Sequence, residues 1–475
     1  MIGAGYHARR IYIPDLNTNE LVNLVACLDL KSQEEKIKTF LNEKKISLEC
    51  YFTDNYHQSD SLDNEEIKQL EIIINTHVIE AVVISTEPLA HFKYVNWALD
   101  NNLHVLLDKP ITTEIDVSVN EEKALKLYSD FKYLKEKYEE KLKTKNLVFM
   151  LQAQRRFHGG FIVARDKIQE MTKMSNCPVT SITSFHSDGQ WRFPKEIIEQ
   201  DYHPYNKGYG KMSHSGYHSL DIAIWLAESS LVQNKKWDNF QLYTQFVRPS
   251  DFLSQINKED YFKLFPDLDK NILSDEVIKN TSKVKGEIDA FTNISLKKGD
   301  AIITNITCNT LHNGFSQRNW IDVSNRDLYK GNGRIRQESY IIEQGPFQSI
   351  IINSFQSEEI LKSSLSKYEM GGEYHFDIHL FRNSRLFSNV KAYEHIDIDK
   401  IMPALEEKGY SRGHQEEARC ACNMEFFHAI TDNIPAYSQT SNFLTHNLTT
   451  KILSSIYLSA SEQNNGKHGI IKEII

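Results

Sequence analysis

The sequence lacks the segments that would direct a chain into or across a membrane. It has no run of about 18 apolar residues, so a membrane-spanning helix is not expected. It has no basic head followed by a long apolar stretch, so a secretory signal peptide is not expected either. No block of lysine and arginine stands out in a chain with a net charge of −9, which argues against a nucleic-acid partner. These absences predict a soluble, cytoplasmic protein.

Cysteine is also scarce, with six residues in the chain. Only Cys420 and Cys422 lie close together, and no second pair of ligands stands near them in the sequence. A disulfide framework and a cysteine metal site are therefore not expected, and the thiols are predicted to be reduced.

What is present is enough hydrophobic sequence for two domains: 40% of 475 residues. Residues 1–150 alternate apolar strands with amphipathic helices, including a long charged helix at about 121–143. This pattern predicts an α/β domain with a doubly wound parallel sheet. Residues 151–475 predict a second, α+β domain with an open, mostly antiparallel sheet, interrupted by insertions near 229–285 and 317–417.

The opening stretch MIGAGYHARR has the spacing of a dinucleotide-binding turn. Gly3 would allow the tight turn, Gly5 the approach of a pyrophosphate, and Ala8 the packing of a helix on the sheet. Asp29 ends the next predicted strand. It follows the glycine turn by about 20 residues, the distance at which an acidic residue binds the adenosine ribose in such folds. The alternatives are a chance turn and a capping or surface role for Asp29. Only Met1 and Ile2 precede Gly3, so the first strand is expected to be clipped or to continue upstream.

Asp29 favours NAD(H), because its carboxylate would repel a 2′-phosphate. Lys31 and Ser32 leave NADP(H) open.

LLDKP places Lys109 at the carboxyl end of a predicted strand, where ligands bind in doubly wound folds. A half-buried lysine there can donate a hydrogen bond to a substrate oxygen or move a proton. The alternative is a solvated lysine at a strand end.

GYGKMSHSGYHSLD predicts a helix with His214, His218 and Asp221 on one face. His218 would be a general base, since the pKa of histidine lies near neutrality. Two histidines and a carboxylate also resemble a zinc site, but the HExxH glutamate is missing and no metal is expected. The third interpretation is a set of polar residues at the start of a buried helix.

Together these motifs resemble the Gfo/Idh/MocA family of oxidoreductases, named for glucose-fructose oxidoreductase and inositol dehydrogenase. The matching segments, in chain order, are IGAGYHARR, VVISTEPLAH, LDKP, QRRFHGG, GYGKMSHSGYHSLD, FTNISLKKGDAIIT and ILSSIYLSASEQ. The second departs from the family pattern by the inserted Glu87, and the third by Asp108 in place of glutamate.

The resemblance implies an N-terminal Rossmann domain, a C-terminal domain whose open sheet forms a homo-oligomer (dimer or tetramer), and a catalytic pair, Lys109 and His218. The residues expected at the cofactor are Gly3, Gly5, Tyr6, His7, Ala8, Asp29, Ser85, Thr86, Pro88, His91, Asp108 and Lys109. The residues expected at the substrate are Arg156, Tyr202, His203, Lys207 and Asp221. The loop that holds Tyr202, His203 and Lys207 could equally be structural.

One departure concerns the catalytic machinery. The first carboxylate of the family motif falls on His214, which is expected in the catalytic site but supplies no fixed negative charge. The expected activity is hydride transfer between NAD(P) and a hydroxyl or keto carbon of a sugar, sugar derivative or cyclic polyol. The alternatives are glycoside hydrolysis through transient oxidation and non-catalytic dinucleotide binding.

Overall fold

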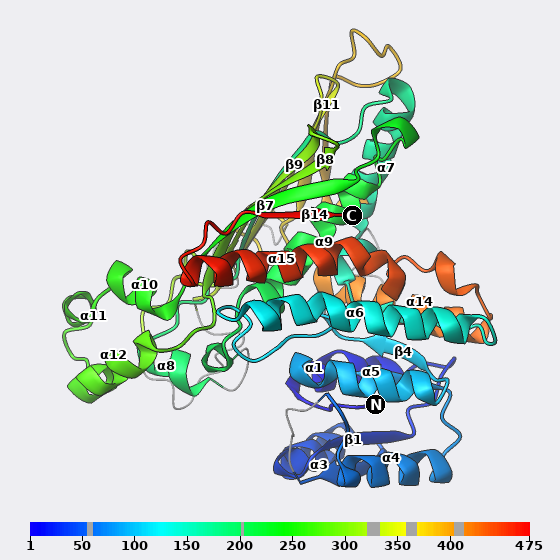
Figure 1. Ribbon diagram of the computed structural model, residues 1–475, viewed down its shortest axis with the longest axis vertical. Helices are drawn as coiled ribbons and strands as arrows, with labels where there is room; N and C mark the ends of the chain where they lie inside the picture. Colours follow the sequence, from blue (N-terminus) through cyan, green and yellow to red (C-terminus); the bar gives the residue numbers. More distant parts are fainter. Residues whose placement is uncertain (55–59, 201–203, 321–332, 358–367, 403–412) are drawn as a thin grey trace. The chain divides into compact units, whose positions relative to one another are not determined.

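The computed structural model (Figure 1) describes residues 1–54, 60–200, 204–320, 333–357, 368–402 and 413–475. The chain forms two compact units, each made of segments that are separate in the sequence. The first unit comprises Met1–Thr113, Leu127–Phe157 and Gln415–Thr450. The second comprises Glu114–Lys126, His158–His414 and Lys451–Ile475.

The first unit is built on a parallel sheet that is completed by a single residue, Ile2. Its strands are β1 (Ala26–Leu30), β2 (Glu49–Thr53), β3 (Ala81–Ile84), β4 (His104–Leu107) and β5 (Phe149–Leu151). β1 pairs with β2, and β3, β4 and β5 pair in series. Ile2 pairs in parallel with Leu28 of β1 and with Ile84 of β3. The resulting order, with Ile2 as the first strand, is that of a doubly wound Rossmann sheet. The predicted fold class is confirmed, and the first strand is one residue long.

Helices alternate with these strands along the chain (Figure 1). They are α1 (Tyr6–Arg10), α2 (Tyr12–Asn17), α3 (Glu34–Lys44), α4 (Asn64–Thr76), α5 (His91–Asp100) and α6 (Glu121–Leu142). The helix α6 confirms the long charged helix expected at about 121–143. The start of α4 shows how the sequence sets a helix boundary: Asp63 and Glu66 form a reciprocal capping box.

A distant segment completes the first unit. The helix α14 (His414–Thr431) buries Phe426 and Phe427 against Tyr12 and Leu106. Apolar burial of this size stabilises the unit by several kcal/mol, at about 25 cal/mol per Å². A single boundary at residue 150 therefore does not describe the compact units, because the first core is closed by residues near the C-terminus.

The second unit contains a nine-stranded sheet in the order β13-β12-β11-β10-β6-β9-β8-β7-β14. Its pairs are antiparallel except for β6 and β9, which run parallel. The first five strands in chain order are β6 (Ser181–Ser187), β7 (Asn239–Val247), β8 (Asp289–Lys298), β9 (Ala301–Leu311) and β10 (Ile335–Gln344). The others are β11 (Gln348–Ser357), β12 (Asp377–Arg382), β13 (Tyr393–Asp397) and β14 (Ile471–Ile474). The expected mostly antiparallel sheet is confirmed.

Helices cover one face of this sheet. They include α7 (Gly159–Ser175), α9 (Tyr217–Glu228) and α15 (Asn447–Asn464). α9 packs on β6 and β9, and α7 packs on β12. Side chains alternate along each strand, so that in β8 Thr292 and Ile294 are buried while Phe291 and Asn293 are exposed on the other face.

Both stretches expected to be insertions contribute strands to the sheet. β7 lies within 229–285, and β10 to β13 lie within 317–417. These strands have a low average hydropathy because one of their two faces is covered and the other is open.

The remainder of the first stretch does form a separate lobe of short helices. It contains α10 (Pro249–Gln255), α11 (Lys258–Leu264) and α12 (Asp275–Ser282). Tyr261 and Phe265 from this lobe pack with Trp191 and Phe193, which immediately precede α8 (Pro194–Glu199). None of the helices in the described part of the chain combines the length and apolar composition that crossing a bilayer requires.

A buried ion pair contributes to the stability of the first unit, and substitution of its lysine tests how large that contribution is. Lys93 Nζ lies 2.6 Å from Glu66 Oε1, and both side chains are completely buried. The Lys93→Met variant should lose about 3–5 kcal/mol of unfolding free energy, because the carboxylate keeps its burial and loses its cation. Denaturant unfolding measures this loss.

Two further variants control that experiment. Lys93→Met combined with Glu66→Gln should recover much of the loss, because glutamine keeps one acceptor oxygen and nearly the same volume but carries no charge. Lys38→Met, which removes an exposed partner of Glu34, should change stability by about 0.5 kcal/mol or less. Equal losses for Lys93→Met and Lys38→Met would contradict the argument.

Candidate functional site

Cofactor residues predicted from the sequence lie at the carboxyl edge of the first unit's sheet. Gly3 follows Ile2, Asp29 lies near the end of β1, Ser85 follows β3 and Asp108 follows β4. These strands are parallel and in register. Their carboxyl ends therefore share one edge, the place where ligands bind in doubly wound sheets.

The glycine turn has the backbone that its sequence predicts. Gly3 has φ +84°, and a Cβ there would lie 2.5 Å from the carbonyl oxygen of Ser85. A side chain at this position would be strained and would push β3 away. A Cβ on Gly5 would meet no atom within 4 Å, so the space over Gly5 is open to a ligand. Ala8 is fully buried in the core beneath the turn.

Asp29 is tied to the same turn. Its Oδ2 accepts a hydrogen bond from the backbone N–H of Ala4 at 2.6 Å, and its Oδ1 accepts one from Leu30 N–H at 2.6 Å. Burial raises the pKa of Asp29, opposed by these two hydrogen bonds and by the charge of Arg9. Each carboxylate oxygen still has acceptor capacity for a hydroxyl group.

The loop after β3 contains an unsatisfied polar atom. Within the described chain, the hydroxyl of Ser85 is buried without a hydrogen-bond partner. The next residue, Thr86, donates its hydroxyl to Glu87 O at 3.3 Å, and Pro88 opens a short 3-10 turn. A buried hydroxyl without a partner is costly, so Ser85 marks a place where a ligand atom would be favourable.

His91 connects the loops that follow β3 and β4. The ring is completely buried. Its Nδ1 lies 2.7 Å from Pro110 O, and its Nε2 lies 3.2 Å from Thr86 O. Burial lowers the pKa of His91, so the neutral ring donates one proton, and the shorter contact to Pro110 is the hydrogen bond. His91 therefore positions the edge of the site.

Asp108, His7 and Lys109 form a charged group at the end of β4. His7 Nε2 lies 3.5 Å from Asp108 Oδ2, and the backbone N–H of Lys109 donates to Asp108 Oδ1 at 2.9 Å. Burial alone would raise the pKa of Asp108, but the interactions of its carboxylate with His7 and with Lys109 outweigh burial and hold the pKa below its usual value. Burial lowers the pKa of His7 to about 4, so this ring is neutral at pH 7. Lys109 is half-buried, and Tyr6 is exposed.

Arg156 has a structural position, which corrects its assignment to the substrate. The side chain is completely buried. Its guanidinium donates to Thr445 Oγ1 at 2.7 Å and lies 3.3 Å from His446 Nδ1. These contacts join two segments of the first unit, so Arg156 stabilises that unit.

In the second unit, the predicted histidine helix begins later than expected. The helix α9 starts at Tyr217, and Met212–Gly216 form a wider π-type turn in which His214 has φ −97° and ψ −107°. His214 therefore does not share a regular helical face with His218 and Asp221. All three side chains are buried, and the His214 ring lies between those of Tyr205 and Tyr209, at 6.3 and 5.4 Å. Tyr202 and His203 lie outside the described residues, and Lys207 ends a short turn and is half-buried.

Glu287 anchors the segment that leads into this turn. Its Oε1 accepts hydrogen bonds from Met212 N–H at 2.9 Å and from the Tyr457 hydroxyl at 2.8 Å. Its backbone carbonyl accepts from Lys211 N–H, and a Cβ on Gly210 would lie 2.0 Å from that carbonyl oxygen. Glycine is therefore required at Gly210 for this close approach.

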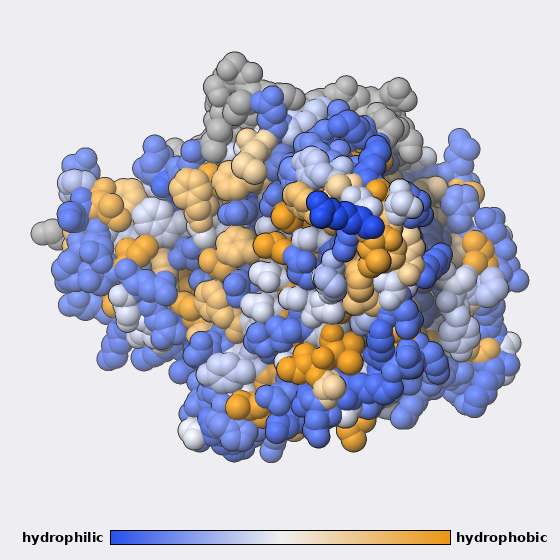
Figure 2. Space-filling view, turned by 90° about the horizontal axis from the view of Figure 1, so that it is seen from above, coloured by the Kyte–Doolittle hydropathy of each residue, from blue (hydrophilic) through white to orange (hydrophobic). Residues whose placement is uncertain are grey.

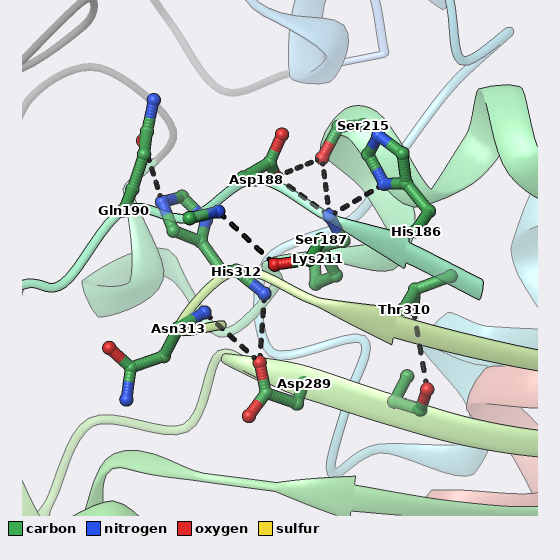
Figure 3. Close-up of polar contacts among 12 residues, drawn as sticks. His186, Ser187, Asp188, Gln190, Lys211, Ser215, Asp289, Thr310, His312 and Asn313 are labelled. Atoms are coloured by element: carbon green, nitrogen blue, oxygen red, sulfur yellow. Dashed lines mark hydrogen bonds and ion pairs between the residues drawn. The ribbon is translucent and has the colours of Figure 1, made fainter. Parts of the chain in front are cut away.

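A largely buried group of polar residues is here called the Lys211 cluster and consists of Lys211, Asp188, His186, Ser215 and Arg334. Figure 3 labels the first four of them. Lys211 Nζ contacts Asp188 Oδ2 at 2.7 Å, His186 Nδ1 at 2.9 Å and Ser215 Oγ at 3.0 Å. These acceptors use the three protons of the ammonium group. Arg334 adds a second cation 3.0 Å from Asp188 Oδ1.

The opposite charges of Lys211 and Asp188 each oppose the effect of burial on the pKa of the other residue. Burial would raise the pKa of Asp188, but Lys211, His186 and Arg334 hold it well below its usual value. Burial lowers the pKa of Lys211, opposed by the charge of Asp188. Asp188 is thus an ionised carboxylate in the second unit, although the motif itself carries histidine at position 214.

His312 is a buried imidazole next to the cluster. Its Nε2 lies 2.8 Å from Gln190 Oε1, which also accepts from Arg192 Nη2 at 2.8 Å. An amide oxygen only accepts, so Nε2 carries the proton of the neutral ring. Burial holds the pKa of His312 well below its usual value, and its Nδ1 has no hydrogen-bond partner among the described residues. His312 is therefore a neutral base with a bare nitrogen, 5.5 Å from the Tyr205 ring between centroids.

Sequence reasoning missed these buried groups for different reasons. Lys211 stands inside the recognised motif, where a lysine between glycine and methionine gives no signal of burial. Asp188 and His312 follow β6 and β9, which pair in parallel although far apart in the chain. The carboxyl ends of two parallel strands are the signal that could have identified them.

The comparisons with known proteins agree with this geometry. Residues 1–129 match the model of the oxidoreductase family with an NAD-binding Rossmann fold, Gfo/Idh/MocA. The sequence matches no curated protein.

Solved structures similar to this fold come from several bacteria. An oxidoreductase from Agrobacterium radiobacter, in complex with NAD+, L-tartaric acid and magnesium, is 12% identical with a TM-score of 0.56, covering 100% of this chain and 96% of that one. Aldose-aldose oxidoreductase from Caulobacter crescentus, complexed with glycerol, is 12% identical with a TM-score of 0.55, covering 100% and 98%. Myo-inositol 2-dehydrogenase from Lactobacillus plantarum is 12% identical with a TM-score of 0.54, covering 100% and 98%. At this identity the similarity establishes the fold.

Glu287 gives the second unit a defined pH dependence. Burial raises the pKa of Glu287 from 4.5 to about 7, opposed by its hydrogen bonds and by the charge of Arg248. Folding therefore favours the protonated carboxyl. This contribution to stability is fully present below about pH 4.5 and is lost as the pH rises to about 7.

Glu287→Gln removes that dependence while keeping an acceptor oxygen. Between about pH 5 and pH 7.5, the wild type should lose roughly 2 kcal/mol of unfolding free energy relative to the variant. Urea unfolding at both pH values measures the difference. Parallel stability profiles for the two proteins would show that Glu287 titrates normally.

Proposed function

Because residues 1–129 match the model of the Gfo/Idh/MocA oxidoreductase family, we propose that the protein is an NAD(P)-dependent oxidoreductase. The proposed reaction transfers hydride between the nicotinamide and a carbinol or keto carbon of a sugar, sugar derivative or cyclic polyol. The observation that carries this proposal is the set of cofactor-type residues on one carboxyl edge of a parallel sheet. That edge is where such folds bind dinucleotides.

The residues present fit a dinucleotide. Gly5 faces open space, Ser85 has a buried hydroxyl without a partner in the described chain, and Asp29 keeps acceptor capacity. In the proposal, Gly3 and Gly5 hold the pyrophosphate, Asp29 accepts from the ribose hydroxyls, and Ser85 and Thr86 bind near the nicotinamide. A nicotinamide bound there would supply the hydride acceptor or donor.

Asp29 also supports a preference for NAD(H). A carboxylate near the adenosine ribose repels a 2′-phosphate and accepts hydrogen bonds from the free hydroxyls. Lys31, the cation that could attract a phosphate, is paired with Asp54. NADP(H) is the weaker cofactor in this proposal.

The proton-transfer roles are assigned to named side chains. Lys109 would hold the substrate oxygen and stabilise its developing negative charge, and Asp108 would keep the Lys109 loop in place. His218 would exchange the hydroxyl proton. His214 replaces the carboxylate of the family motif, and Asp188 is the ionised group that the second unit supplies instead.

His312 is a second candidate for the base. Its bare Nδ1 and its hydrogen-bonded Nε2 have the arrangement of an oriented imidazole. His218→Asn and His312→Asn distinguish the two. The variant that loses turnover while retaining cofactor affinity identifies the base.

A polyhydroxylated substrate suits the buried polar groups of the second unit. The Nδ1 atom of His312 is buried and has no partner among the described residues, so it can accept a hydrogen bond from a substrate hydroxyl group. The similar solved structures include an aldose oxidoreductase and an inositol dehydrogenase by name. Asp221 remains a proposed substrate-side residue on α9.

We also propose a homo-oligomer formed through the open face of the sheet. That face carries exposed Phe291, Ile302, Ile341, Phe381 and Tyr393. The space-filling view in Figure 2 shows apolar side chains gathered in small patches between hydrophilic ones on one side of the molecule. Sedimentation velocity distinguishes a dimer or tetramer from a monomer.

The function is tested by titration of the purified protein with NAD+, NADH, NADP+ and NADPH, followed by turnover assays on a panel of sugars and inositols. Saturable binding with net NADH formation from a polyol supports the proposal. Release of a glycosidic aglycone without net NADH formation identifies the hydrolytic alternative. Binding without any turnover identifies a dinucleotide-binding protein.

Lys109→Met should abolish most turnover and leave dinucleotide affinity nearly unchanged. Loss of one donor to a developing oxyanion costs about 10²–10³ in kcat. Steady-state kinetics and calorimetric titration measure the two effects separately. The control is Lys145→Met, because this exposed lysine of the first unit donates to the backbone carbonyl of Asn102. Full activity in Lys109→Met would remove this lysine from the mechanism.

Asp29→Asn should reduce the preference for NAD+ over NADP+ by about 10- to 100-fold. This range follows from the free energy of one hydrogen bond to a charged group, converted to a ratio of dissociation constants. Asp432→Asn, which neutralises an exposed carboxylate beside His428, should leave the preference unchanged. An unchanged ratio in Asp29→Asn would place the adenosine ribose elsewhere.

A further inference from the structure

A cluster of histidine and aspartate side chains lies on the β12–β13 pair, far along the chain from the motif histidines. Asp377 and His379 belong to β12, and His395 and Asp397 belong to β13. In the antiparallel register Asp377 faces Asp397 and His379 faces His395. Residues at i and i+2 of a strand share a face, so all four side chains lie on one side of the sheet. We propose that this group binds a zinc ion through Asp377, His379 and His395.

The distances from the Asp377 carboxylate to the two histidine nitrogens match those between neighbouring ligands of a tetrahedral metal ion. Asp377 Oδ2 lies 3.3 Å from His379 Nε2 and 3.2 Å from His395 Nε2. Each of the three residues offers one ligand atom, and these three atoms lie within 4.8 Å of one another. Zinc bonds of about 2.0–2.1 Å in tetrahedral geometry separate neighbouring ligand atoms by roughly 3.3 Å. Two imidazoles and a carboxylate are a typical donor set for zinc.

Hydrogen bonding alone explains the arrangement less well. His375 Nε2 also points at Asp377 Oδ2, at 3.6 Å, so three ring nitrogens converge on one oxygen. A carboxylate oxygen has two lone pairs. His395 Nε2 in addition lies 3.1 Å from Asp397 Oδ1, and one N–H does not serve two acceptors well. A cation between the nitrogens and the oxygen accounts for the convergence.

Neighbouring groups orient the proposed ligands. His375 Nδ1 accepts the backbone N–H of Phe355 at 2.9 Å, so the proton of the neutral ring is on Nε2. His375 therefore directs an N–H toward Asp377, at 3.6 Å, and has no lone pair on that nitrogen for a metal ion. His379 Nδ1 lies 3.0 Å from the Tyr393 hydroxyl, and a proton placed there leaves the lone pair on Nε2. Such outer partners are usual around metal-binding histidines.

The position in the sheet indicates what the ion would do. β13 is the edge strand, and two carboxylates directly opposite each other on a strand pair repel. The ligand side chains are partly exposed, at 14% for Asp377, 29% for His379 and 37% for His395. The ion can therefore enter from solvent, hold β13 against β12, and keep water in its fourth coordination position.

The test uses the full chain without an affinity tag, stripped of metal by a chelator and then titrated with ZnCl2. We expect one high-affinity zinc ion per chain, measured by calorimetry and by elemental analysis after desalting. Zinc should also raise the melting temperature, since it binds the folded state. Cobalt should bind at the same stoichiometry and give the intense visible absorption of a tetrahedral site.

Variants assign the site to its ligands. Removal of an outer partner of a metal site lowers metal affinity by about 10- to 100-fold. His375→Ala should reduce the zinc affinity within this range. His379→Ala and His395→Ala, which each remove a ligand, should reduce it further. His428→Ala is the matched control, because this partly exposed histidine faces one carboxylate, Asp432, at 3.3 Å. It should bind zinc as the wild type does.

Two outcomes would overturn the proposal. One is the absence of saturable zinc binding to the wild-type chain. The other is unchanged affinity in His379→Ala and His395→Ala. Should an alanine variant fold poorly, Asp377→Asn keeps the side-chain volume and should itself abolish the cobalt absorption. An intact cobalt spectrum in Asp377→Asn would contradict the assignment.

Discussion

The backbone hydrogen bonds of Ile2 hold the candidate cofactor site together. Ile2 N–H donates to Val83 O at 2.9 Å, and Ser85 N–H donates to Ile2 O at 2.8 Å. On the other side, Gly3 N–H donates to Leu28 O at 2.9 Å. One residue thus joins the two halves of the parallel sheet and aligns the glycine turn with the ends of both neighbouring strands. Without it, Asp29 and Ser85 would belong to separate sheets.

The second unit depends on a different constraint, the burial of charge. Lys211 is completely buried, and each proton of its ammonium group is donated in a hydrogen bond. The Asp188 carboxylate forms ion pairs with both Lys211 and Arg334. Removing one member of such a group leaves an uncompensated buried charge. The network therefore fixes the segment between Gly210 and α9, which carries His214 and leads into the helix that carries His218.

Much of the fold could be predicted from the sequence, because periodicity and turn chemistry are local. The apolar strands, the helix at 121–143 and the glycine turn all have local signatures. β7 and β10 to β13 lie within the stretches expected to be insertions. Each of these strands has one open face, so its polar and apolar residues alternate and its hydropathy signal is weak. The docking of α14 in the first unit and the single-residue strand at Ile2 depend on contacts between distant segments, which no local pattern records. Arg156 was assigned to the substrate from its place in a motif, whereas its completely buried guanidinium binds Thr445.

The central claim is that a nicotinamide dinucleotide binds over the turn at Gly3–Ala8. Hydrogen–deuterium exchange of the full chain, with and without saturating NAD+, tests it most directly. The account predicts slower amide exchange at Gly3–Ala8, around Asp29 and at Ser85–Thr86. Equal exchange at these three places in the presence and absence of the nucleotide would contradict it.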